Sequence, residues 1–401
     1  MALRGGQILH VGNGVTVIDR LQVAGSGDLN IPTEKIYELG NYESVATIRD
    51  VPDISFNMES LDVSCEMEAL LTDKPLATTD AFELTAVRSL NITSPIKAGK
   101  DKTNPYSIIA SVGIPGLMPE SVSYNFGLRD NARQTVTLRG DSIFYAPGMV
   151  KVEKIDAGAD ALTTASPAGI YRGSNGPTRI LAVVQGNSKL TEGPDYTVPP
   201  VGTDAYTGVT VTLANPVPTG EVAYVMYFTN EAHEMPQSVH ETVAVKPAAV
   251  RGRDIDIYFG AILPENKVTG VQSFTLDWRA TIDRDEEFGN YYATSVGFDV
   301  PSASGSIEIL PRDVPDLMRR IRQVSGVTNP DEAIGPNLAA PTPVHAVIKD
   351  PNNGGQVIKV ISVDAARFTV PGYTGRANEK LPVTLNWEDD LGKVVVRKAI
   401  P

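Results

Sequence analysis

A 22-residue stretch of this chain occurs twice, 249 positions apart and without a gap. Residues 38–59 and 287–308 share nine identities, which gather in three short groups. The groups are Glu-x-Gly-Asn-Tyr, Asp-Val-Pro, and a serine and a glutamate separated by three residues. Unrelated segments of this length share roughly one or two residues at ordinary composition. Solenoid repeats have periods of only tens of residues, so the recurrence predicts instead that one folding unit occurs twice.

The recurring residues favour structural roles. A glycine followed by Asn and Tyr is typical of a tight turn in which the glycine adopts a positive φ. The prolines interrupt strand-like patterns, which predicts a bulge or a strand edge. Structural roles are therefore predicted for Gly40, Asn41, Tyr42, Pro52, Gly289, Asn290, Tyr291 and Pro301.

Short runs of alternating apolar and polar residues indicate a mainly β protein with largely antiparallel strands. In residues 54–59 and 273–278 one face of each strand is apolar and the other polar, so these strands are expected to cover a core on one side only. Helical patterns are few. The residues at 66–71 and 313–324 predict one short helix after each occurrence of the repeat.

A weaker likeness extends the repeat. Residues 124–126 (Tyr-Asn-Phe) precede the strand-like run 134–138, and residues 385–387 (Leu-Asn-Trp) precede the run 393–397. We therefore predict two tandem β-sandwich or half-barrel units, each with a flanking short helix. The predicted boundaries are 15–150 for the first unit and 245–401 for the second. Residues 155–235 have no counterpart and alternate short strands with turns, which predicts an inserted small Ig-like β-sandwich.

Composition and motifs argue against several classes of function. The net charge of −13 disfavours nucleic-acid binding, which requires a basic face. Cys65 is the only cysteine and the four histidines do not fit a zinc pattern. The chain has no nucleophile elbow and no apolar run near the ~20 residues needed to cross a bilayer. We expect no enzyme activity, no cofactor, no metal site and no membrane partner.

The order of strands and helix, the Glu-[Leu/Phe]-Gly-Asn-Tyr motif and the Asn-Phe and Asn-Trp strands resemble bacteriophage tail tube proteins. The resemblance implies a structural virion protein whose rings stack into a tube for genome ejection. With two fused units, three chains would form a pseudo-hexameric trimer. Its partners would be itself and other tail proteins, and DNA would pass through without specific binding. The implied location is the phage tail, assembled in the host cytoplasm.

The resemblance and the alternation together suggest residues that line the channel. The polar faces of the two repeated strands carry Ser55, Asn57, Glu59, Ser304, Ser306 and Glu308. The alternative is that these faces meet bulk water on the outside. Two other functions stay open: a tail or baseplate ring component used once per particle, and a β-sandwich that binds a surface glycan.

Overall fold

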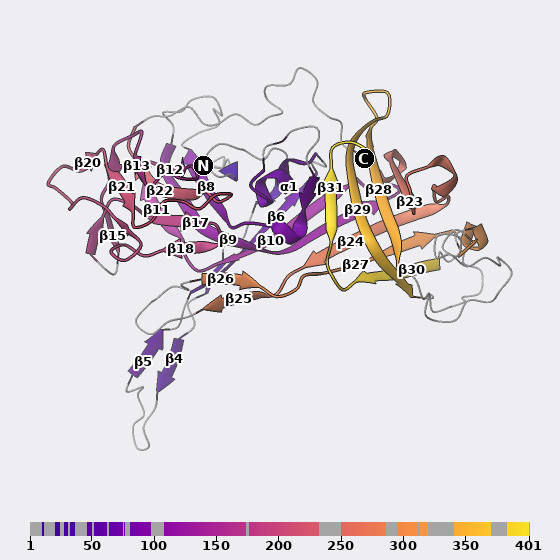
Figure 1. Ribbon diagram of the computed structural model, residues 1–401, viewed down its shortest axis with the longest axis horizontal. Coiled ribbons are helices and arrows are strands. Elements are labelled where there is room, and N and C mark those ends of the chain that lie inside the picture. Colours follow the sequence, from indigo (N-terminus) through magenta and orange to yellow (C-terminus); the bar gives the residue numbers. More distant parts are fainter. Residues whose placement is uncertain are drawn as a thin grey trace, which may run out of the picture.

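The computed structural model has a mainly β fold in which sixteen strands belong to one hydrogen-bonded network (Figure 1). The described residues are 10–11, 21–24, 28–30, 33–36, 46–49, 52–61, 64–74, 76, 81–97, 108–173, 176–231, 250–285, 295–310, 313–316, 318–319, 341–369 and 383–400. Within them the predicted β character is confirmed.

A central sheet runs through both halves of the chain in the order β2-β6-β10-β9-β24-β27-β30-β29. The strands are β2 (Leu21–Ala24), β6 (Asp53–Ser60), β10 (Arg133–Gly140), β9 (Ile108–Gly127), β24 (Val271–Arg279), β27 (Ser302–Ile309), β30 (Val383–Asp389) and β29 (Gln356–Thr369). β3 (Asp28–Asn30) continues the pairing of β2 along β6.

Two side sheets branch from the long strands β9 and β29. The N-terminal side sheet joins β1 (His10–Val11), β8 (Leu90–Lys97), β9 and β11 (Phe144–Pro147). The C-terminal side sheet joins β23 (Ile255–Phe259), β28 (Thr342–Asp350), β29, β31 (Val394–Arg397) and β7 (Ala81–Glu83). β9 changes sheets where Pro115 precedes Gly116, whose φ of +65° suits glycine.

The pairing registers of the first half recur in the second. Val23 lies opposite Glu59 in β6, and Ser273 lies opposite Glu308 in β27. A register shift precedes the pair in both places. Two hairpins outside the central sheet also share a register: β4 (Thr33–Ile36) with β5 (Ala46–Arg49), and β25 (Ile282–Asp285) with β26 (Ser295–Phe298). Each hairpin residue of the first half has its counterpart 249 positions later.

The predicted alignment of residues 124–126 with 385–387, and of 134–138 with 393–397, is wrong. β10 and β30 occupy the same position beside β6 and β27, since Thr135 lies opposite Glu59 and Thr384 lies opposite Glu308. Residues 134–138 therefore correspond to 383–387, again 249 positions apart, and not to 393–397. The two-residue Asn-aromatic match misled the alignment, because alternating strands resemble one another at many offsets.

One hydrophobic core lies between the central sheet and the two side sheets, and residues of both halves contribute to it. Ile54, Phe56 and Met58 face this core, as do Phe274 and its alternate neighbours in β24, so the predicted apolar faces are confirmed. The predicted first helix is α1 (Glu66–Leu71), in which all six residues are buried. Of the predicted helix at 313–324, residues 314–316 and 318–319 are helical and the remainder lies outside the described residues except Asp313, which is in a 3-10 turn.

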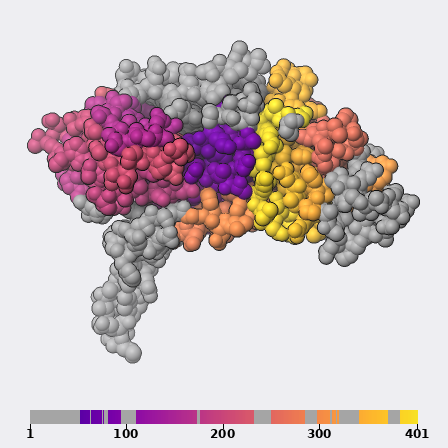
Figure 2. Space-filling view, in the orientation of Figure 1, coloured from indigo at the N-terminus to yellow at the C-terminus, as the bar shows by residue number. Residues whose placement is uncertain are grey.

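The segment between the halves forms two small sheets that enclose a second core. One contains β12 (Met149–Ile155), β22 (Ala223–Thr229), β17 (Ala182–Gln185) and β18 (Ser188–Leu190); the other contains β13 (Ala161–Thr163), β21 (Thr210–Leu213) and β19 (Tyr196–Thr197). Short pairs join β14 (Ala168–Gly169) to β20 (Tyr206–Thr207) and β15 (Tyr171–Gly173) to β16 (Gly176–Thr178). The sheets begin at Met149, ahead of the predicted boundary at 155. We call residues 149–229 the inserted segment; it lies at one end of the molecule (Figure 2).

Candidate functional site

The two halves meet where β24 pairs with β9, and this internal junction makes the central sheet continuous. Seven consecutive residues of β24, from Ser273 to Arg279, lie opposite Gly127 to Ser121 in antiparallel register. On the core side Phe274 stacks between Phe126, at a ring-centroid distance of 6.0 Å, and Trp387, at 6.5 Å. The backbone ladder fixes the register, and the aromatic stack supplies buried apolar area.

The opposite face of the central sheet is polar and continues across the junction. Side chains at its alternate positions are Ser, Thr, Asn, Asp, Glu and Arg. The six candidate lumen residues all lie in this face: Ser55, Asn57, Glu59, Ser304, Ser306 and Glu308. Each is partly or fully exposed, while the intervening residues of β6 are buried.

Carboxylates on the polar face of the first half are paired with arginines. Glu59 lies 3.0 Å from Arg133. Arg139 lies 3.0 Å from Glu120 and 3.5 Å from Asp53. Because these groups are partly exposed, each pair contributes little to stability, but the pairs reduce the negative charge that the face presents.

In the second half the matched Glu308 accepts a hydrogen bond from the Ser273 hydroxyl at 3.0 Å. The Ser306 and Thr275 hydroxyls lie 2.8 Å apart. Glu59 and Glu308 thus occupy equivalent positions but have different partners. An arginine offsets the charge of Glu59, whereas Glu308 accepts a bond from a neutral hydroxyl, so the local net charge differs between the two positions.

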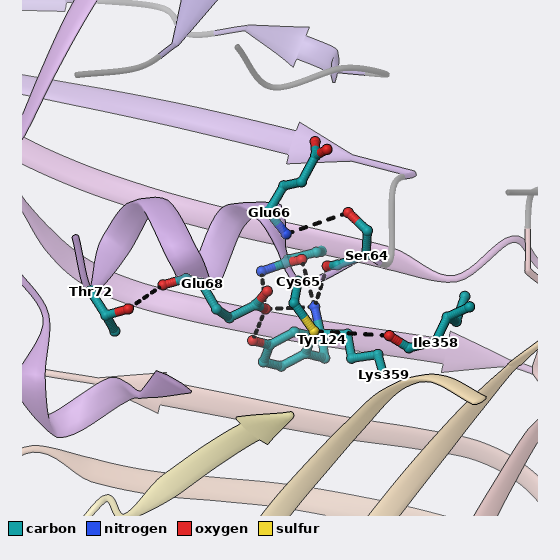
Figure 3. A network of polar contacts seen from close by, with 9 residues as sticks. Ser64, Cys65, Glu66, Glu68, Thr72, Tyr124, Ile358 and Lys359 are labelled. Carbon is teal, nitrogen blue, oxygen red and sulfur yellow. Dashed lines mark hydrogen bonds and ion pairs between the residues drawn. The ribbon is translucent and has the colours of Figure 1, made fainter. Parts of the chain in front are cut away.

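A buried polar network joins α1 of the first half to β29 of the second (Figure 3). Lys359 Nζ lies 2.6 Å from Glu68 Oε1, and both side chains are fully buried. Lys359 also donates to the carbonyl oxygen of Ser64 at 3.1 Å and to Gln134 Oε1 at 3.2 Å. Gln134 Nε2 and the Tyr124 hydroxyl both donate to the same Glu68 oxygen. Three acceptors thus surround the ammonium group, which has three protons to donate.

Tyr124 contributes its ring as well as its hydroxyl to this network. Lys359 Nζ lies 5.0 Å from the centroid of the ring, a cation–π distance. Burial, and then the charge of the Glu68 carboxylate, raise the pKa of the Tyr124 phenol well above its usual value. The phenol therefore stays protonated and remains a donor. Because both charged side chains are buried, removal of either would leave an uncompensated charge where the two halves meet.

The β25–β26 hairpin of the second half makes a separate contact with the first half. Arg284 of β25 lies 2.9 Å from Asp53 at the start of β6 and donates to the Gly140 carbonyl oxygen at 3.3 Å. β26 also lies beside β18 of the inserted segment. Lys189 of β18 contacts Asp141 and Ser142 in the turn after β10. Burial lowers the pKa of Lys189, and the nearby Arg284 charge acts in the same direction.

Most of the predicted repeat-motif residues lie outside the described residues: Gly40, Asn41, Tyr42, Gly289, Asn290 and Tyr291. Pro52 and Pro301 are described, and each immediately precedes a strand of the central sheet, β6 and β27. Proline is tolerated there because it leaves no ladder donor missing.

Sequence reasoning missed the residues that join the halves. Lys359 and Glu68 lie 291 positions apart, and no spacing in the sequence relates them to each other or to the cross-strand pair Tyr124 and Gln134. Arg284 could have been found, since it stands 249 positions after Lys35 and is also basic.

No metal-ligand set is evident in the described part of the chain, where no three His, Cys, Asp or Glu side chains group together. No helix among the described residues is long and apolar enough to span a membrane. No protein-family model matches this chain, and no curated protein matches it.

Proposed function

We propose that this chain is a structural virion protein that polymerises into stacked rings and forms a phage tail tube, a conduit for DNA. In this proposal one folding unit is duplicated in the chain, and three chains form a ring with six-fold pseudo-symmetry. The protein acts in the phage tail after assembly in the host cytoplasm. Its partners are further copies of itself and other tail proteins.

The observation that carries the proposal is the internal junction. β24 of the second half adds to β9 of the first half, so one unit extends the sheet of the other with a polar face on one side. The matching registers of the two halves imply that the same addition can repeat between chains. Among the described residues β2 pairs on one side, with β6, and an addition on its other side would repeat the junction between chains. Closure into a ring removes sheet edges.

The charge of the chain suits a conduit. The net charge of −13 repels DNA at long range. On the polar face the arginines near Glu59, Asp53 and Glu120 offset part of the local negative charge. A wall of short hydroxyl and amide side chains with offset charges offers DNA few phosphate contacts, which are the main source of non-specific affinity.

Electron microscopy of the purified protein in negative stain tests the proposal, together with the mass of the assembled species by analytical ultracentrifugation. We expect long tubes with a regular ring spacing, and rings containing three chains of 42.9 kDa each. Single rings that never stack would favour the alternative of a tail or baseplate ring component. A protein that stays monomeric over the whole accessible concentration range would contradict both ring proposals. Glycan affinity in such a monomer would favour the surface-binding alternative.

A further inference from the structure

The two hairpins that share a register have different surroundings. In β4–β5 Lys35 lies opposite Thr47, and in β25–β26 Arg284 lies opposite Val296, so Lys35 holds the position of Arg284. Arg284 binds Asp53 and the Gly140 carbonyl oxygen of the first half. Within the described part of the chain β4 and β5, in contrast, pair with each other alone, and they project from the body of the molecule in Figure 1.

The second half has a surface equivalent to the one that Arg284 contacts. Ser302 starts β27 as Asp53 starts β6, and Asp389 ends β30 as Gly140 ends β10. The turn after β30 packs on the residue before β27, because a Cβ on Gly392 would lie 2.6 Å from the carbonyl carbon of Pro301. We call residues 299–302 together with 388–392 the 300/391 surface.

Two large residues of the 300/391 surface are exposed, whereas a described counterpart of one of them in the first half is buried. Val300 is 75% exposed and Leu391 is 63% exposed. Ser142, the counterpart of Leu391 at the 249-residue offset, is 3% exposed beneath Lys189 of the inserted segment. Val300 and Leu391 each adjoin the close contact between Pro301 and Gly392, and an apolar patch with a polar rim is typical of an interaction site.

The charges of this surface complement the hairpin. Asp299, Glu388 and Asp390 are exposed and adjoin the two apolar residues in the chain, and Arg367 lies 3.6 Å from Asp390. The hairpin strands carry two basic residues, Lys35 and Arg49, and one carboxylate, Glu34. A basic group at the position of Arg284 would therefore meet carboxylates, as Arg284 itself does in the first half.

We infer that the β4–β5 hairpin of one chain docks on the 300/391 surface of a second copy of this chain, with Lys35 beside Ser302 and close to the Glu388 carboxylate. The contact repeats between chains the contact that β25–β26 makes within one chain. The inference rests on the proposed self-assembly and names the surfaces that join adjacent chains.

Charge reversal gives the first test. Lys35→Glu is expected to raise the protein concentration needed for assembly about tenfold, because it places a carboxylate against acidic groups at each chain–chain contact. Ser302→Lys in the same chain is expected to restore the original threshold by supplying the opposite charge. An unchanged threshold in Lys35→Glu would overturn the docking assignment.

Cross-linking between differently mutated chains gives the second test. Chains carrying Lys35→Cys are mixed with chains carrying Ser302→Cys under assembling conditions and treated with a short bismaleimide. We expect a covalent dimer that forms only in the mixture. The native Cys65 is fully buried and should not compete with the introduced thiols. The matched control is Arg284→Cys with Asp53→Cys in one chain, which should cross-link internally whether or not the chains assemble.

The outcomes separate the two proposals. Tubes or rings visible by microscopy, with the internal control cross-linked but no covalent dimer, would reject the hairpin contact and leave the proposed function intact. A lack of any assembly would reject both. Circular dichroism of each variant first establishes that the fold is retained. The cross-linking result is interpreted only for variants that pass this check.

Discussion

At the scale of single residues, the ion pair between Lys359 and Glu68 is the feature most sensitive to substitution. Both side chains are fully buried at the contact between α1 and β29. A buried pair of this kind adds little compared with well-packed apolar residues, but removing one partner leaves an uncompensated charge in the core.

Lys359→Met is expected to lower the free energy of unfolding by roughly 3–5 kcal/mol, because the Glu68 carboxylate stays buried without its cation. Adding Glu68→Gln should recover part of this loss, since a neutral amide can still accept from Tyr124 and Gln134. Urea unfolding followed by circular dichroism measures both variants. Arg133→Met, which breaks the exposed pair with Glu59, serves as the control and should cost less than about 1 kcal/mol. Equal costs for Lys359→Met and Arg133→Met would contradict this account.

His345 makes stability depend on pH. Burial lowers its pKa from the usual 6.5, and the nearby Arg397 acts in the same direction, while Asp364 and the Gly260 backbone act against them. Its Nδ1 lies 2.8 Å from the Ser362 hydroxyl. Because the folded state holds the neutral ring, the unfolded state binds the proton more readily below pH 6.5. The contribution is complete above that pH and is lost as the pH falls towards the lowered pKa.

We therefore expect the difference in unfolding free energy between pH 7.5 and pH 5 to be smaller in His345→Gln than in the parent chain. Urea titrations at the two pH values measure this difference directly. The other histidines remain in both proteins and cancel in the comparison. An identical pH dependence in the two proteins would show that His345 titrates normally.

The sequence predicted the buried faces of strands, but it did not predict the contacts of the buried polar network. The buried faces of β6 and β24 follow from strict alternation, which needs only local information. The Lys359 network did not follow, because its members come from α1, β9, β10 and β29 and meet only after the sheets have paired. A buried lysine also carries no sequence mark that separates it from a solvated one.

At the scale of elements, the inserted segment is attached more closely than a loosely tethered domain. Its Val150, Met226 and Phe228 share one apolar cluster with Phe144 and Ala146 of β11. Ser89 bonds to the carbonyl oxygen of Gly186 at 2.6 Å and, through its backbone N–H, to Asn187. The segment thus covers part of the first half, and its removal uncovers that surface.

Deleting residues 149–229 and joining the ends through a short Gly-Ser linker tests this attachment. Met149 lies opposite Thr229 in adjacent strands, so the ends are close enough for such a linker. We expect the remaining chain to fold but to aggregate, since exposing Phe144 forfeits about 1.5–3 kcal/mol of burial. Adding Phe144→Thr should restore solubility, as measured by size-exclusion chromatography. Loss of the native circular dichroism spectrum in both variants would contradict the interpretation as an insertion.

Element types were easier to predict than element partners. The runs that became β17, β19, β21, β22, β24 and β31 all carry strand patterns in the sequence. The alignment of residues 124–126 with 385–387 was wrong, because short strand motifs match at several offsets. The long identical stretch at the 249-residue offset avoided this ambiguity, and its register agrees with the pairing of β4 with β5 and of β25 with β26.

At the scale of the whole molecule, the composition predicted a mainly β protein but not the junction between its halves. Pairing of β9 with β24 joins residues about 150 positions apart. Several strand edges could pair at such long range, and a single sequence does not indicate which of these pairings is the most stable. The order of strands in the central sheet shows which strand edges pair. It also shows that the second half adds to the first on the side of β9, which leaves β2 at the other end of the row.

The β9–β24 junction has a kinetic consequence for a chain that closes rings as proposed. Two separate proteins would have to find each other at the ambient protein concentration for every contact around the circle. Here alternate contacts form between tethered neighbours, at the far higher local concentration that a covalent link provides. Only the remaining contacts would respond to dilution, so nucleation would require fewer diffusive encounters than if the two halves were separate chains.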